Sequence, residues 1–148
     1  MSVVREFESA FNTADIPALL RCFTGDATYV DTFYGSHTGQ GSLRAMFERM
    51  FHEGQGYRWH MERIVESGAL AAAEWTFSYT VTDAVPRSAG RLVRFPGMSV
   101  FELEGGRIAS YREYFDMGDA LLQLGFRAES MAKVVRRYRM GNPEIAPS

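Results

Sequence analysis

Apolar residues recur at helical spacing at the start of the chain and at strand spacing farther along. Val4, Phe7 and Phe11 share one helical face, which predicts a first helix. Asp15 is expected to cap a second helix at residues 16–23. The two helices are therefore predicted to be joined by a tight turn.

The middle of the chain carries the pattern of long antiparallel strands. From residue 71 to residue 80 one set of alternate positions is apolar, which is typical of a strand with one buried face. Pro96 and Gly97 lie inside another predicted strand and indicate an edge position or a bulge. The remaining predictions here are a turn at 24–26, strands at 27–31, 90–102, 107–115 and from 57 onward, a loop at 34–41 and a helix at 42–51.

Two further helices are predicted to close the chain, at residues 116–124 and 129–140, before a loose end rich in Gly and Pro. Helices followed by a run of antiparallel strands predict the α+β class, with a bent sheet wrapped around the N-terminal helices. No linker or repeat divides the chain. We therefore predict one domain at residues 1–126, with a helical extension and loose tail at 127–148.

Composition narrows the functional classes. With 148 residues, 46% of them hydrophobic, the chain can bury a core, and its net charge of −2 provides no basic field for a nucleic acid. Cys22 is the single cysteine, which excludes a disulfide within the chain and a cysteine zinc cluster. No apolar run approaches the length of ~20 residues that a membrane span needs. A cytoplasmic protein without nucleic acid or membrane partners is expected.

Asp31 is the first candidate for chemistry. It ends a short strand in which Tyr29 and Asp31 point to the same side. If that side faces an apolar hollow, desolvation raises the pKa of the carboxyl group toward the range of a general acid or base. The alternative is that Asp31 opens a turn by accepting hydrogen bonds from the backbone that follows.

Glu113 is the second candidate. One face of its strand carries Ala109, Tyr111, Glu113 and Phe115, and periodicity alone does not decide whether that face is buried. If it is buried, Glu113 is an acid among aromatic side chains, and such acids are paired or functional. The alternative is a surface acid or a salt bridge to an arginine.

Three histidine and glutamate positions are weaker candidates. His37 lies in the glycine-containing loop and is interpreted as a solvated residue or one at a cavity mouth. His60 and Glu62 share one face of a strand, but two ligands are too few to indicate a metal site. No metal site is therefore predicted.

Three stretches of the sequence resemble a known family. TGDATYVD at 24–31, EGGRIASYREYF at 104–115 and DMGDALLQLGF at 116–126 resemble the SnoaL-like branch of the nuclear-transport-factor-2-like (NTF2-like) superfamily, over residues 6–126. The resemblance implies a cone of curved antiparallel sheet and helices around a deep pocket. It also implies a homodimer formed through the sheet. Ketosteroid isomerases, limonene-epoxide hydrolases and polyketide cyclases belong to this superfamily, so fold alone does not define function.

The resemblance to ketosteroid isomerases is partial. Asp31 falls where those enzymes keep their catalytic base. Their two oxyanion donors fall at Phe7 and Met98, neither of which can donate a hydrogen bond. Because losing one such donor costs about a hundredfold or more in rate, a standard ketosteroid isomerase is not expected.

The resemblance to the epoxide hydrolases is also partial. Tyr29 matches their water-holding tyrosine and Glu113 matches one acid of their Asp–Arg–Asp relay, whereas Asp31 replaces an asparagine. The arginine and the other acid fall at Trp75 and Phe77, so the full relay is absent. The remaining set, Tyr29, Asp31 and Glu113 in an otherwise apolar pocket, resembles polyketide-cyclase sites, in which a single acid/base works on a bulky substrate.

Two main hypotheses follow, with a protein-interaction partner as a third. The first is a cofactor-independent enzyme for a small apolar or polycyclic substrate, with Asp31 as acid/base, Glu113 as second acid or water holder and Tyr29 as hydrogen-bond donor. The second is a non-catalytic binding module for a small hydrophobic ligand, or a structural dimer. No nucleotide, metal or flavin signature is visible, so no cofactor is predicted. The predicted ligand-contacting residues are Phe7, Phe11, Phe47, Trp75, Phe77, Met98, Tyr111 and Phe115.

Overall fold

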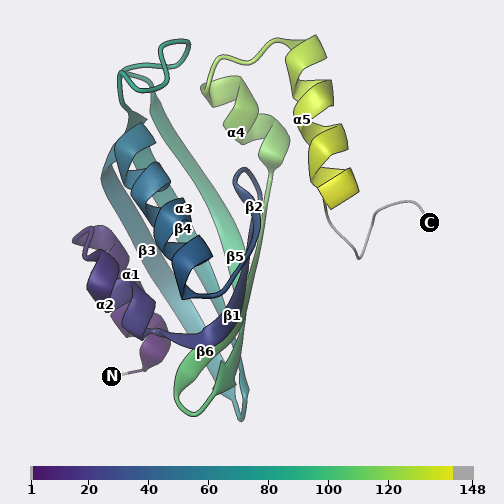
Figure 1. Ribbon diagram of the computed structural model, residues 1–148. Coiled ribbons are helices and arrows are strands. Elements are labelled where there is room, and N and C mark those ends of the chain that lie inside the picture. The colour runs from purple at the N-terminus through teal and green to yellow at the C-terminus, as the bar shows by residue number, and fades with distance from the viewer. Residues whose placement is uncertain (1, 142–148) are drawn as a thin grey trace.

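The structure, a computed structural model, describes residues 2–141, and it confirms the predicted α+β class (Figure 1). Five helices and six strands make up this part of the chain. They are α1 (Val3–Asn12), α2 (Ile16–Arg21), β1 (Phe23–Asp31), β2 (Gly35–Thr38), α3 (Gln40–Glu53), β3 (Gly54–Ser67), β4 (Leu70–Val81), β5 (Leu92–Glu104), β6 (Arg107–Phe115), α4 (Met117–Gln123) and α5 (Ala128–Gly141). The end expected to be loose, at residues 142–148, lies outside the described residues.

All six strands belong to one curved sheet in the order β2-β1-β6-β5-β4-β3. The pairs are antiparallel except β1 with β6, which run parallel. Register shifts interrupt the long β3–β4 pair at two places, and such bulges bend a sheet. Helices α1, α2 and α3 cover the inner face of the sheet, and α4 and α5 lie beyond the end of β6 (Figure 1).

The core lies between the helices and the inner face of the sheet. The alternation predicted for residues 71–80 is confirmed, since Ala71, Ala73 and Trp75 on β4 are buried. Gly97 on β5 is needed opposite Trp75, because a Cβ atom at Gly97 would lie 2.4 Å from the indole ring. Large aromatic side chains therefore fill most of the space inside the cone.

Several local predictions are corrected by long-range pairing. The second helix ends at Arg21, and the predicted turn at 24–26 lies inside β1, where the β1–β6 register shifts between Phe23 and Thr28. The predicted loop at 34–41 contains β2, which forms a hairpin with β1. Pro96 lies in an interior strand without a register shift at its own position, but β6 pairing begins only at Gly97, so one side of Pro96 has no ladder partner.

Residues 2–141 contain no helix that is both long enough and apolar enough to cross a membrane.

Candidate functional site

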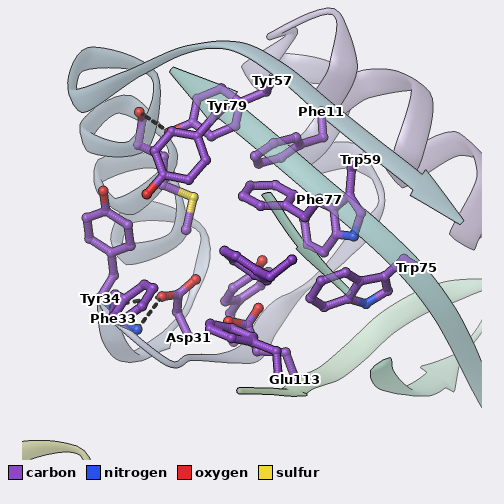
Figure 2. Close-up of a pocket in the computed structure, with 14 residues that line it drawn as sticks. Phe11, Asp31, Phe33, Tyr34, Tyr57, Trp59, Trp75, Phe77, Tyr79 and Glu113 are labelled. Atoms are coloured by element: carbon purple, nitrogen blue, oxygen red, sulfur yellow. Dashed lines mark hydrogen bonds between the residues drawn. The ribbon is translucent and has the colours of Figure 1, made fainter. Parts of the chain in front are cut away.

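A small cavity lies between the inner face of the sheet and the helices, and we call it the aromatic chamber (Figure 2). Its volume is about 50 Å³, which gives room for about three water molecules. Two carboxylic acids, Asp31 and Glu113, are the acidic members of its wall. The lining residues are Phe11, Tyr29, Asp31, Phe33, Tyr34, Met50, Tyr57, Trp59, Trp75, Phe77, Tyr79, Phe95, Glu113 and Phe115.

Asp31 combines the two alternatives that the sequence left open. Its Oδ1 atom accepts hydrogen bonds of 2.8 Å from the backbone N–H groups of Phe33 and Tyr34, so Asp31 does open a turn. The other carboxylate oxygen points into the aromatic chamber (Figure 2). Burial raises the pKa of the Asp31 carboxyl, and the two backbone hydrogen bonds partly oppose this shift.

Glu113 is buried on β6 and makes no ion pair within residues 2–141. Its Oε2 atom accepts a hydrogen bond of 3.1 Å from the backbone N–H of Thr32, in the turn that Asp31 opens. Burial, together with the charge of Asp31, raises the pKa of Glu113 to about 8. A carboxyl group with this pKa is mostly protonated at neutral pH.

A chain of hydrogen bonds leads to Glu113 through the interior of the sheet. Trp75 Nε1 donates to Ser99 Oγ at 2.8 Å, Ser99 donates to the Tyr111 hydroxyl at 2.9 Å, and Tyr111 donates to Glu113 Oε1 at 2.8 Å. An indole N–H can only donate a hydrogen bond. The hydrogen-bond chain therefore runs from Trp75 as first donor to Glu113 as final acceptor. Each carboxylate oxygen of Glu113 thus accepts one hydrogen bond: Oε1 accepts from Tyr111 and Oε2 accepts from Thr32.

Tyr29 stands beside this chain without joining it. Its ring stacks on the ring of Tyr111, with centroids 4.1 Å apart and an interplanar angle of 19°. Its buried hydroxyl has no hydrogen-bond partner of adequate geometry within the described residues. Burial, followed by the nearby charges of Glu113 and Asp31, raises the pKa of Tyr29, so the hydroxyl stays protonated. It is a donor available to a bound molecule.

The structure places only half of the predicted ligand-contacting residues in the wall of the chamber. Phe11, Trp75, Phe77 and Phe115 line it. The other four do not: Phe7, Phe47 and Tyr111 are buried in the core, and Met98 is 47% exposed on the outer face of the sheet.

The position of Met98 has a simple physical reason. In β5 the inward side chains are at odd-numbered positions, since Val93, Phe95, Ser99 and Phe101 are all buried. A shift of one residue moves a side chain to the opposite face of a sheet. Ser99, and not Met98, therefore holds the inward polar position on this strand.

Sequence reasoning missed part of the wall. Tyr57 and Trp59 at the start of β3 line the chamber, and their alternation was the one available signal. Phe33 and Tyr34 follow Asp31 in the turn and also line the chamber. No local pattern predicts that position, because the turn is brought over the chamber only when β1 pairs with β2 and β6.

The weaker candidates do not enter the chamber wall. His37 Nε2 lies 2.8 Å from the Tyr34 carbonyl oxygen and its Nδ1 lies 2.8 Å from Ser42 Oγ. His60 and Glu62 are exposed on β3, and Glu62 accepts a hydrogen bond from Thr76. Within residues 2–141, no group of three or more His, Cys, Asp or Glu side chains is placed to hold a metal ion.

The curved, unclosed sheet and the helices that cover its inner face form an α+β cone, and the two acids lie inside it. The sequence profile of the SnoaL-like domain matches residues 4–111, and the chain belongs to this family. The fold is thereby confirmed as that of the NTF2-like superfamily. No curated protein sequence matches the chain significantly.

Solved structures show the same fold. A proposed polyketide cyclase from Pseudomonas putida KT2440 is 26% identical, with a TM-score of 0.70 over 83% of this chain and 98% of that one. A Catenulispora acidiphila protein with a ketosteroid isomerase-like fold, in complex with trimethylamine, is 20% identical, with a TM-score of 0.75 over 86% and 95%. An LEH-like epoxide hydrolase from M. tuberculosis is 23% identical, with a TM-score of 0.69 over 90% and 92%.

Proposed function

We propose that this protein is a cofactor-independent enzyme that moves a proton on a small apolar substrate in the aromatic chamber. The observation that carries the proposal is a pair of buried carboxyl groups in one apolar cavity. In the proposal Asp31 is the base, because two backbone hydrogen bonds oppose the rise of its pKa, and Glu113, whose pKa is raised to about 8, is the acid. A base and an acid are then present together at neutral pH. Relatives of the fold that bear the names polyketide cyclase and epoxide hydrolase support this kind of chemistry.

Three polar groups of the chamber, on Asp31, Glu113 and Tyr29, have defined roles in the proposal. The free oxygen of Asp31 removes a proton from a carbon atom next to a carbonyl group or from a water molecule. Glu113 donates its proton to the oxygen atom on which negative charge develops. The Tyr29 hydroxyl donates a hydrogen bond to the same substrate and orients it. The apolar wall excludes water, which strengthens all three interactions.

Proton exchange on a ring ketone tests this proposal directly. With 2-tetralone in D₂O, the enzyme is expected to accelerate exchange of the protons next to the carbonyl, followed by NMR. Asp31→Asn and Glu113→Gln are expected to slow exchange by about a hundredfold or more. Glu66→Gln, at an exposed acid on β3 with no hydrogen bond or ion pair among the described residues, is the matched control.

Two results would contradict the proposal. One is a ring substrate, from this ketone or from a wider screen, that the Asp31→Asn and Glu113→Gln variants convert as fast as the parent. The other needs no substrate: carboxyl NMR at pH 7 that finds both acids ionised, with ordinary pKa values.

A binding module for a small hydrophobic ligand is the second candidate. The mainly aromatic wall of the chamber favours it. Native mass spectrometry of the purified protein separates the two functions. A retained and chemically unaltered molecule supports binding alone, whereas its conversion to a product supports the enzyme.

A further inference from the structure

A second, larger cavity lies directly outside the aromatic chamber, and we call it the outer vestibule. Its volume is about 380 Å³. Asp31, Phe33 and Tyr34 line both spaces, so the turn after β1 is the partition between them. Helix α5 forms the opposite wall, where Val134 is buried and Arg137 faces the vestibule. A molecule in the vestibule therefore lies beside Asp31, the acid that lines both spaces.

Arg49 is held in place at this partition. Its Nε atom donates a 2.7 Å hydrogen bond to Glu53 Oε1, and its guanidinium lies 4.9 Å from the centre of the Tyr34 ring. The Tyr34 hydroxyl donates to the other oxygen of Glu53 at 3.1 Å. The charge of Glu53 is thus already paired. The two terminal amino groups of Arg49 have no hydrogen-bond partner within residues 2–141.

Arg137 supplies a second positive charge to the same space. Its side chain is exposed on α5 and has no hydrogen bond or ion pair within residues 2–141. Asp31 is the one acid that residues 2–141 contribute to the vestibule wall, and its Oδ1 atom is occupied by the backbone of the partition. Within the described residues, the vestibule is lined by two guanidinium groups whose terminal amino groups have no hydrogen-bond partner.

We propose that the substrate is an organic anion, whose apolar part enters the aromatic chamber while its charged group stays in the vestibule on Arg49 and Arg137. Guanidinium groups bind carboxylate and phosphate oxygens through paired, charge-assisted hydrogen bonds. The anion is kept on the arginine side of the partition, away from Glu113, where its burial would be costly. The inference rests on the proposed function and names its substrate class.

Two matched probes test the head group. 4-Phenylbutyrate and 4-phenyl-1-butanol share a ring and a four-carbon chain, but only the first carries a charge. The chain has two tryptophans, Trp59 and Trp75, and both line the chamber, so their indole N–H signals in ¹H–¹⁵N NMR report on its occupancy. The full-length protein is expected to bind the acid about tenfold more tightly than the alcohol, the gain from one charge-assisted contact.

Arg137→Gln is expected to reduce this preference to threefold or less while leaving the affinity for the alcohol unchanged. Arg136→Gln is the matched control, because Arg136 is exposed on the same helix but does not line the vestibule. Arg49 is left intact because it also holds Glu53 and Tyr34.

Three results would overturn the inference. They are equal affinity for acid and alcohol, indole signals that neither probe moves, and a loss in Arg136→Gln as large as in Arg137→Gln. The titration measures binding alone. Equal affinity for acid and alcohol therefore contradicts the anionic substrate class and does not bear on proton transfer. Unimpaired proton exchange in Asp31→Asn and Glu113→Gln contradicts proton transfer and does not bear on the binding of an anion.

Discussion

Tyr29 and Tyr111 stack face to face with ring centroids 4.1 Å apart, yet their hydroxyl groups have opposite environments. The Tyr111 hydroxyl accepts from Ser99 and donates to Glu113, while the Tyr29 hydroxyl has no partner within residues 2–141. Both side chains are fully buried. The pair therefore separates the effect of a hydroxyl group from the effect of its hydrogen bonds.

Replacing each tyrosine by phenylalanine is expected to give different stabilities. Tyr111→Phe removes the acceptor of the Ser99 hydroxyl and one of the two donors to Glu113, and it is expected to lower the free energy of unfolding by about 1–3 kcal/mol. Tyr29→Phe removes an unpartnered polar group and is expected to change it by less than about 0.5 kcal/mol. Urea denaturation measures both values. Equal losses in the two variants would show that the hydrogen bonds to Tyr111 do not stabilise the fold.

The pKa of Glu113 makes stability depend on pH. Its value rises from an ordinary 4.5 to about 8 in the folded state, so between these limits the folded protein binds more protons than the unfolded chain. The free energy of unfolding is then expected to fall as pH rises from about 4.5 to about 8. Burial raises the pKa of Asp31 as well, which acts in the same direction.

Denaturation at a series of pH values checks this slope. Glu113→Gln removes the titrating group, and the difference between parent and variant isolates its contribution from those of other groups. The parent is expected to lose stability relative to the variant as pH rises. A difference that stays constant over this range would mean that Glu113 titrates normally.

Ser99 is expected to act on Glu113 through Tyr111. Ser99→Ala removes the acceptor of the Trp75 indole and the donor to Tyr111, so Tyr111 becomes a weaker donor to Glu113. The pKa of Glu113 is expected to rise above its parent value, though by less than in Tyr111→Phe. Carboxyl NMR titration measures it.

The control for this titration is Ser78→Ala, at a partly exposed serine of β4 whose side chain has no hydrogen bond among the described residues. It should leave the titration of Glu113 unchanged. A pKa of Glu113 that is the same in Ser99→Ala and in the parent would show that the hydrogen-bond chain does not reach the acid.

Met98 and Tyr114 are register partners on β5 and β6 and are 47% and 50% exposed on the outer face of the sheet. A homodimer through this face remains a prediction from the family resemblance. If it forms, Met98→Glu buries a charge in the interface and is expected to give monomers in analytical ultracentrifugation. Leu122→Glu, exposed on α4 away from the sheet, should leave the dimer intact. A monomeric parent would contradict the prediction.

Local pattern was sufficient for the order of the helices and long strands, though not for the short strand β2, and for the buried face of β4. Apolar spacing determines the type of an element and its two faces, and the segments that resemble SnoaL-like proteins identified the fold. Asp31 and Glu113 were also found from the sequence, because an acid within an apolar strand pattern is unusual. Their catalytic roles remain proposals.

Only the tertiary structure decided which faces meet. Periodicity describes both faces of β6 equally well, and it is pairing with β1 and β5 that turns Glu113 toward the turn after Asp31. The same long-range register places Ser99 inside and Met98 outside. A strand pattern repeats every two residues, so a shift of one residue leaves the sequence signal unchanged and reverses every side chain. Contacts between distant segments therefore set the site.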